Sequence, residues 1–129
     1  MRTRIAIILV AALAALTVTA VPSASAATNV HEAVLKGSAA FPQVNGKAKF
    51  QVDNGVRELQ VEIEDANALI GQKLRIRVNS VLVGTMTVNS FGNARFDKRS
   101  NTLPAVTTGT PIRIRRAADG TLVASGRFA

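Results

Sequence analysis

The sequence contains no cysteine, no tryptophan and no tyrosine, and it has a single histidine, His31. The missing thiols exclude a disulfide-stapled miniprotein, a zinc ribbon, a covalent haem site and a cysteine hydrolase. One imidazole supplies too few ligands for a zinc site. His31 also lies near the start of the expected domain, where we expect a solvated side chain. We therefore expect no metal ion and no other cofactor.

Motifs of catalysis and of nucleotide binding are missing as well. The sequence has no Gly-x-Ser-x-Gly elbow, and its nine glycines are scattered rather than gathered in a phosphate-binding loop. Glu58, Glu62 and Glu64 lie on one face of one expected strand, whereas a glycosidase needs two carboxylates that face each other across a cleft. The five phenylalanines are the only aromatic residues, so base stacking has little support and we expect no sequence-specific binding of nucleic acid. The sequence favours a protein that is not an enzyme.

Residues 1–26 have the pattern of a secretory signal peptide. A short cationic start precedes an uncharged apolar run over residues 5–21, and Ala24 and Ala26 fit the A-x-A pattern of a cleavage site. An uncleaved membrane anchor is the alternative, but the apolar run is short for the ~20 residues that a span requires. We expect cleavage after Ala26, a single domain over residues 27–129, and no transmembrane segment after processing. The expected location is extracellular or associated with the cell envelope.

The rest of the chain alternates apolar and polar residues with a period of two, which is typical of half-buried strands. Residues 58–64 and 73–78 show the pattern most clearly. The full set of expected strands is 33–41, 47–52, 58–64, 73–78, 81–88, 94–97, 112–115 and 122–128. We predict an all-β fold, a single small antiparallel β-sandwich or barrel of about seven or eight strands. The expected core consists of Leu59, Val61, Ile63, Leu74, Ile76, Val78, Ile112 and Ile114.

Turn signals separate these strands. Asn54-Gly55 is a strong signal for a tight hairpin, because both residues tolerate positive φ. Asn79-Ser80 and residues 90–93 and 118–120 mark further turns. The segment 99–111 is the longest expected loop. Pro111 should lie on an edge strand or open a strand as its first residue, since it cannot donate to a β-ladder.

Charge is distributed unevenly along the chain. Residues 27–65 carry four basic and six acidic side chains, a net charge of −2, whereas residues 66–129 carry ten basic and two acidic ones, a net charge of +8. If the outward arginines share a sheet face, that face would attract an anionic cell-wall polymer, an acidic polysaccharide, anionic lipid headgroups or extracellular nucleic acid. The candidate polyanion-binding residues are Arg75, Arg77, Arg95, Arg113, Arg115, Arg116 and Arg127.

The alternative is a basic surface without a ligand. Arg75 and Arg77 would then pair across strands with the acidic face formed by Glu58, Glu62 and Glu64. The remaining positive charges would protect strand edges from pairing with other chains.

Several short motifs between residues 35 and 128 resemble a recurring kind of small secreted bacterial all-β domain that has no assigned function. They are Leu35-Lys36-Gly37, Gly46-Lys47-Ala48, Arg75-Ile76-Arg77-Val78-Asn79, Gly92-Asn93-Ala94-Arg95-Phe96 and Asp119-Gly120-Thr121-Leu122. Asn79-Ser80 stands where such domains often have Asn-Gly, so a tight turn is less favoured there. The resemblance implies the fold and export, and it assigns no catalytic or binding residue. We therefore expect a secreted structural or binding module, or alternatively a basic domain that associates with polyanions.

Overall fold

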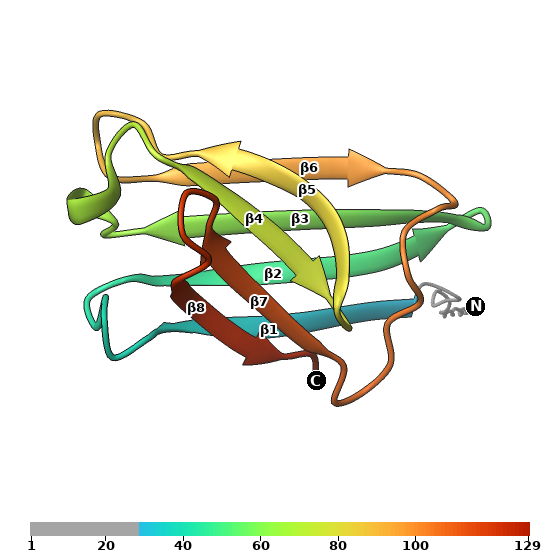
Figure 1. The fold of residues 1–129 in the computed structure, drawn as a ribbon. Helices are drawn as coiled ribbons and strands as arrows, with labels where there is room; N and C mark the ends of the chain where they lie inside the picture. The colour runs from blue at the N-terminus through green and yellow to red at the C-terminus, as the bar shows by residue number, and fades with distance from the viewer. Residues whose placement is uncertain (1–28) are drawn as a thin grey trace, which may run out of the picture.

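The computed structural model describes residues 29–129, so the expected signal peptide and its cleavage site lie outside the described residues. The described chain confirms the predicted all-β, antiparallel class (Figure 1). Its eight strands are β1 (Asn29–Gly37), β2 (Asn45–Asp53), β3 (Val56–Glu64), β4 (Lys73–Val78), β5 (Val81–Thr87), β6 (Ala94–Arg99), β7 (Pro111–Arg116) and β8 (Leu122–Arg127). A 3-10 turn, η3 (Asn67–Leu69), lies in the connection from β3 to β4. Over residues 29–129, no helix has the length and apolar character needed to cross a membrane.

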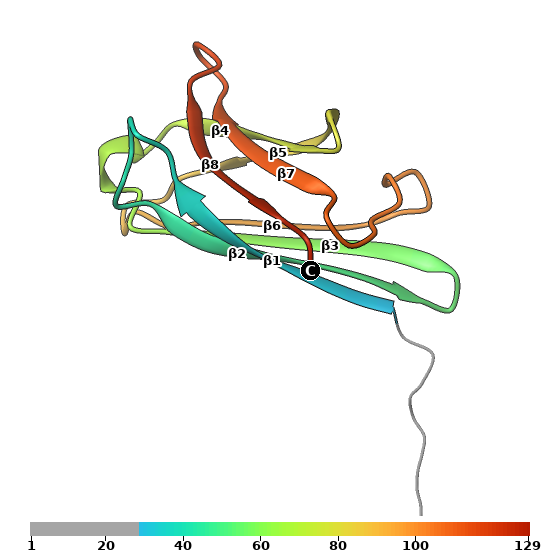
Figure 2. The same ribbon diagram turned by 90° about the horizontal axis from the view of Figure 1, so that it is seen from below.

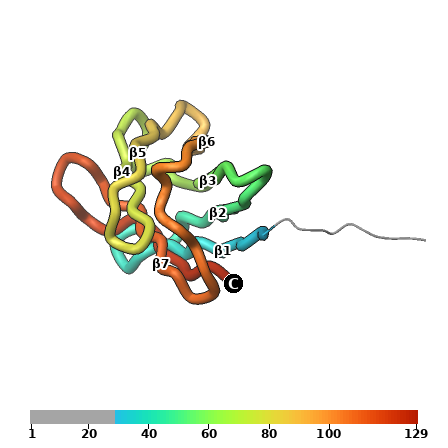
Figure 3. Tube along the Cα trace, turned by 90° about the vertical axis from the view of Figure 1, so that its right-hand side faces the viewer, coloured from blue at the N-terminus to red at the C-terminus, as the bar shows by residue number. Residues whose placement is uncertain are grey.

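The eight strands form one sheet in the order β5-β4-β7-β8-β1-β2-β3-β6, and this sheet curls on itself. Strands β1, β2, β3 and β6 make a first layer, and strands β5, β4, β7 and β8 make a second layer that packs across it (Figure 2). The two edge strands, β5 and β6, come together on one side of the molecule (Figure 3). The result is a nearly closed, barrel-like sheet of two packed layers, which agrees with the predicted small antiparallel sandwich or barrel.

Side chains rather than a backbone ladder close the barrel between β5 and β6 among the described residues. Lys98 on β6 donates a hydrogen bond from Nζ to the Val83 carbonyl on β5, at 3.3 Å. The Phe96 ring lies against Gly84, where any Cβ would collide with it. Gly84 therefore makes room for the aromatic side chain that joins the two edges.

The interior of the barrel is apolar, and none of the buried residues among 29–129 is polar or charged. All eight residues of the predicted core are at most 1 % exposed. They come from β3 in the first layer and from β4 and β7 in the second layer. Both layers therefore contribute to one shared core, as the alternating pattern predicts.

The predicted tight turns are present. Asn54 and Gly55 join β2 to β3 with φ values of 52° and 77°, the positive values that a two-residue hairpin turn requires. Asn79 and Ser80 join β4 to β5 with φ values of 50° and 72°, so this turn is tight even though serine replaces the glycine that favours it. Pro111 is the first residue of β7, as predicted.

The long loop that follows β6 covers one end of the barrel. Its Leu103 and Val106 side chains are buried. Arg57, at the start of β3, donates a hydrogen bond from Nη1 to the Leu103 carbonyl at 2.6 Å. The loop is therefore part of the packed structure.

One predicted strand is displaced along the chain, whereas the others differ from the observed strands by at most two residues at either end. The expectation was residues 33–41, but β1 spans Asn29–Gly37. After Gly37 the chain turns, because the Phe41 N–H donates to the Ser38 carbonyl and the Val44 N–H donates to the Phe41 carbonyl. Phe41 packs against the core from this loop, so its apolar side chain extended the alternating pattern beyond the strand. At the other end, β2 is long enough to pair with β1 back to Asn29.

Candidate functional site: an arginine face on the second layer

The second layer brings four of the predicted arginines together. Arg75 and Arg77 alternate with buried residues along β4, and Arg113 and Arg115 do so along β7, so all four point outward. Strands β4 and β7 are antiparallel neighbours, and their register places Arg75 opposite Arg115 and Arg77 opposite Arg113. Arg127 follows on β8, opposite Pro111 on the same outer surface. We call this outer surface of β4, β7 and β8, with its five arginines, the arginine face.

The backbone hydrogen bonds fix the spacing of the two arginine pairs. The Ala117 N–H donates to the Lys73 carbonyl and the Asn79 N–H donates to the Pro111 carbonyl, each at 2.9 Å. These bonds lie two residues beyond the arginine pairs at either end, so the arginine pairs also occupy hydrogen-bonded positions. Their Cα atoms are then about 5.5 Å apart across the strands. Along each strand, the two arginines are separated by roughly 6.7 Å.

Neutral carbonyl groups hold three of the five guanidinium groups. Arg115 donates from Nη1 to the Gly120 carbonyl at 3.1 Å, Arg127 donates to the Gly109 carbonyl at 2.9 Å, and Arg77 reaches the Ser80 carbonyl at 3.4 Å. These contacts orient the side chains without compensating their charge. Within residues 29–129, no carboxylate lies within 4.0 Å of any arginine of this face. Each guanidinium keeps further N–H donors for a ligand.

The other two predicted arginines lie elsewhere. Arg95 is on β6 in the first layer, where its Nη2 is 3.0 Å from a carboxylate oxygen of Glu62. Arg116 lies opposite Leu74, so it projects from the inner side of β7 at the end of the barrel. There it binds Asp119 with two hydrogen bonds of 2.8 and 3.1 Å, and it lies 5.5 Å from the centre of the Phe41 ring. Both arginines have partners within the fold and do not belong to the arginine face.

The contact between Arg116 and Asp119 also shifts the pKa values of both groups. The hydrogen bond from Arg116 is the main cause that lowers the pKa of Asp119 well below its ordinary value, and the Thr121 N–H adds to it. The same hydrogen bond raises the pKa of Arg116. This ion pair fixes the hairpin between β7 and β8.

The expected pairing of the acidic face with Arg75 and Arg77 is wrong. Strand β3 pairs with β2 and β6 in the first layer, whereas β4 pairs with β5 and β7 in the second. Glu62 therefore lies between Lys47 and Arg95, and Glu58 lies 3.7 Å from Arg99. Glu64 lies opposite Asn45 at the end of β3. The strands on either side of the two arginine pairs, β5 and β8, carry no acidic residue, and Glu32 on β1 lies beyond them, beside Ala129.

Edge protection does not account for the arginine pairs. The edges of the sheet are β5 and β6, and both β4 and β7 have a hydrogen-bonded neighbour on each side. Positive charge discourages foreign pairing only where a strand has an unpaired edge. The two arginine pairs need another explanation.

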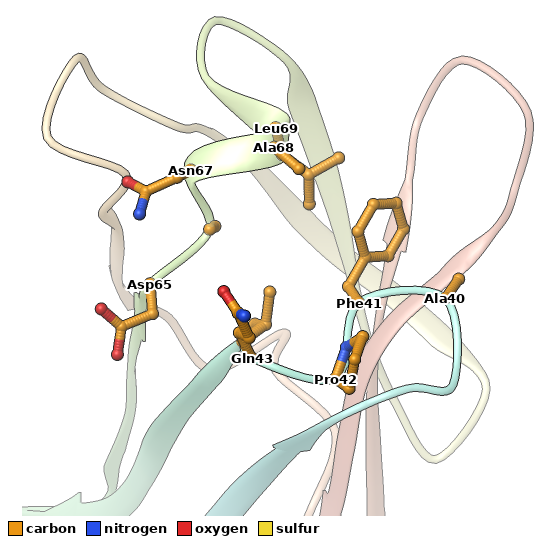
Figure 4. A pocket seen from close by; sticks show the side chains of 10 residues that line it. Ala40, Phe41, Pro42, Gln43, Asp65, Asn67, Ala68 and Leu69 are labelled. Atoms are coloured by element: carbon orange, nitrogen blue, oxygen red, sulfur yellow. The ribbon is translucent and has the colours of Figure 1, made fainter.

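A small pocket of about 220 Å³ opens at the end of the barrel, between the loop after β1 and the segment around η3 (Figure 4). Figure 4 shows the polar groups of Asp65 and Asn67 on one side of the pocket and the Phe41 ring on the other. Asp65 accepts a hydrogen bond of 2.8 Å from the Asn45 amide and is the only titratable residue among those that line the pocket. General acid–base catalysis uses a positioned partner group, which this lining does not supply.

His31 was expected to be solvated, but it belongs to a paired strand. It lies within β1 opposite Phe50, and its Nδ1 is 2.7 Å from the Ala129 carbonyl oxygen. In the described part of the chain, no three His, Asp or Glu side chains gather in a group that could hold a metal ion. The arginine face is the strongest candidate site of this structure.

No family model and no curated protein matches the chain. The arginine face is therefore the feature of the molecule from which a function can be proposed.

Proposed function

We propose that this chain is a secreted, non-enzymatic β-domain that binds anionic polymers of the cell envelope through its arginine face. The observation that carries the proposal is the placement of Arg75 opposite Arg115 and of Arg77 opposite Arg113, with no carboxylate of residues 29–129 within 4.0 Å of them. Like charges directly opposite each other destabilise an antiparallel pair. An anion bound between two such arginines attracts both guanidinium groups and offsets their mutual repulsion. A polyanionic ligand therefore explains why the pairs are present.

Export is proposed from the sequence alone. The cationic start, the apolar run and the A-x-A site within residues 1–26 are typical of a signal peptide. The resemblance to small secreted bacterial domains supports the same location. A cell envelope offers anionic polymers at high local concentration, and such polymers match the charge of the arginine face.

The chemistry of guanidinium suits this task. Arginine stays charged at every physiological pH, and its planar fork donates two parallel hydrogen bonds to a phosphate or sulfate group. Neutralising several anionic groups releases their counterions, so we expect binding to weaken steeply as salt is added. Specificity would come from the spacing of the arginines.

The test is retention on immobilised heparin and on isolated cell wall, measured as the salt concentration at elution. Two double variants remove the same number of positive charges from different layers. Arg75→Gln with Arg113→Gln takes one arginine from each pair of the arginine face, and Arg95→Gln with Arg99→Gln is the matched control in the first layer. We expect the first variant to elute at clearly lower salt, with its log–log salt slope reduced by roughly two. The control should elute close to the wild type.

Equal losses in both variants would show that retention follows net charge and not the arginine face. A wild-type protein that passes through both materials at low salt would remove the polyanion proposal. The domain would then stand as a structural module.

A further inference from the structure

The cationic residues of the second layer lie on four evenly spaced levels, where a level is a set of positions that face each other across the strands. Lys73 on β4 occupies the first level, next to Arg75 on the outer surface and exposed like it. The Arg75–Arg115 pair makes the second level, and the Arg77–Arg113 pair makes the third. Lys73 is not among the predicted arginines, but the alternation of β4 places it on the same face.

Arg127 supplies the fourth level. The Asn79 N–H donates to the Pro111 carbonyl, so residue 111 lies one level beyond the Arg77–Arg113 pair. Arg127 lies opposite Pro111 on β8. Successive levels are two residues apart and are therefore separated by roughly 6.7 Å along the strand direction. Arg127 is also displaced sideways from β7 by one strand spacing of roughly 4.8 Å. We call these six residues, Lys73, Arg75, Arg115, Arg77, Arg113 and Arg127, the cationic track.

We propose that the cationic track binds a linear phosphodiester polymer with short polyol units between its phosphates, and that one phosphate occupies each of the four levels. This inference rests on the proposed function and adds the repeat of the ligand to it. The track crosses the second layer from β4 over β7 to β8 in one direction. A single extended polymer strand can therefore contact every level without bending back.

The repeat of such a polymer matches the repeat of the track for a covalent reason. Two residues of an extended polypeptide contain six backbone bonds and span roughly 7 Å. A phosphodiester polymer with a three-carbon unit also has six bonds between successive phosphorus atoms, and so it has nearly the same extended repeat. Inorganic polyphosphate has only two bonds between phosphorus atoms, and most of its charges would fall between the levels.

At each of the two central levels, the two arginines of the pair can bind one phosphate from opposite sides. The arginines of a pair project from neighbouring strands about 5.5 Å apart, so two guanidinium groups can bind opposite oxygens of one phosphate. Arg115 on the second level and Arg77 on the third are held by turn carbonyls, and Arg127 on the fourth is held by the Gly109 carbonyl. Oriented side chains lose less conformational entropy on binding.

The surface beside the track favours a polymer without bases. The positions next to the second level on the flanking strands are Thr85 and Leu122, and those next to the third level are Leu82 and Ser125, so none of the four is aromatic. Among residues 29–129, the one aromatic ring classed as exposed is Phe91, in the loop between β5 and β6 and not on β4, β7 or β8. Single-stranded nucleic acids usually gain affinity by stacking bases on aromatic side chains, which this face does not provide.

The test is the affinity of glycerol phosphate oligomers of two to eight repeats, measured by titration calorimetry at fixed ionic strength. We expect affinity to rise by up to about fivefold for each added phosphate, the strength of an exposed ion pair. The rise should end at four phosphates. Lys73→Gln removes the first level, so its rise should end at three phosphates. Lys49→Gln, an equal charge change on β2 in the first layer, should leave the limit at four.

Several results would overturn the inference. A continued steep rise beyond four phosphates, or an unchanged limit in Lys73→Gln, would show that the levels do not bind one phosphate each. Equally tight binding of inorganic polyphosphate at matched charge would remove the spacing argument but leave the proposed function standing. Tighter binding of an oligothymidylate of equal charge would show that bases are recognised. No binding of any of these polymers, together with no retention on heparin, would remove both proposals.

Discussion

The two layers of this barrel share one core and differ on the outside. In the first layer, outward charges alternate in sign from strand to strand, as in the row of Lys47, Glu62 and Arg95 across β2, β3 and β6. In the second layer, the corresponding rows place arginine opposite arginine on β4 and β7. In the same antiparallel geometry, the charge pairs of the first layer therefore stabilise the fold, whereas the arginine pairs of the second layer oppose it.

This difference separates the requirements of folding from those of function. Inward positions are apolar in both layers, so hydrophobic burial accounts for the fold without reference to surface charge. Outward positions tolerate many residue types, and the first layer shows that this chain can satisfy them with complementary charges. The second layer lacks such complementary charges at the four positions of the two arginine pairs on β4 and β7. Such departures from local consistency are expected at functional sites.

The largest effect tests whether the two layers share a core. Ile63 on β3 and Ile76 on β4 are both at most 1 % exposed. Truncation of either to alanine should lower the free energy of unfolding by about 2–5 kcal/mol, because each leaves a cavity in the same interior. Urea denaturation measures both losses. Val34→Ala is the control, since Val34 is 71 % exposed and its loss should change stability by less than about 0.5 kcal/mol. A large loss in only one layer would contradict a shared core.

A second test concerns the contact between the edge strands β5 and β6, where the two layers meet without a backbone ladder. Gly84→Ala should lower the free energy of unfolding by about 1–3 kcal/mol, because its Cβ collides with the Phe96 ring. Adding Phe96→Leu should recover part of this loss, so the two changes should be non-additive in a double-mutant cycle. Thr85→Ala, at the exposed neighbouring position on β5, controls for a general effect of substitution there. Simple additivity of Gly84→Ala and Phe96→Leu would show that the two residues are not coupled.

The third test reverses one charge in each layer. Arg75→Glu should raise the free energy of unfolding by about 0.2–1 kcal/mol, because a carboxylate then faces Arg115. The same variant should bind heparin more weakly. Glu62→Arg, which faces Lys47 and Arg95, should lower stability by a similar amount. A less stable Arg75→Glu would mean that the arginine pairs support folding, and the proposed function would lose its main argument.

The sequence predicts which side chains of a strand point into the core better than it predicts which strands lie next to each other. Period-two alternation identified all eight expected core residues, and Asn54-Gly55 identified a tight turn, because both signals act within a few residues. Pairing between strands is set by contacts far apart in the chain. Glu62 and Arg75 come from consecutive strands, so pairing was expected, but the chain crosses through η3 from the first layer to the second between them.

The arginines illustrate the same limit. The alternation of Ile112 and Ile114 correctly predicts that Arg113 and Arg115 point outward. The same alternation places Arg116 on the inner side of β7, and applying it one residue further would have removed Arg116 from the candidate site. Arg95 could not be assigned in this way, because its partner Glu62 depends on the pairing of β6 with β3.

The smallest effect concerns an ion pair that the second layer does contain, between Arg116 and Asp119. The pKa of Asp119 is lowered from its ordinary value near 3.8, so the pair stabilises the folded state above that pH. This stabilisation is lost as the pH falls through the lower pKa of the folded state. Asp119→Asn should therefore be slightly less stable than the wild type at pH 7, and the difference should shrink in strong acid. Urea denaturation at pH 7 and pH 2 measures it.

Both side chains of this pair are solvent-accessible, so added salt should reduce the difference at pH 7. Asp97→Asn, an exposed carboxylate on β6 outside the ion pairs found in residues 29–129, is the matched control and should show no comparable dependence on pH. A difference for Asp119→Asn that is the same at both pH values would show that the charge of Asp119 is not its cause, since the asparagine oxygen can still accept the hydrogen bond from the Thr121 N–H. The hairpin between β7 and β8 would then not depend on the charge of its ion pair. Charge pairs that stabilise folding would then be a feature of the first layer and not of the second.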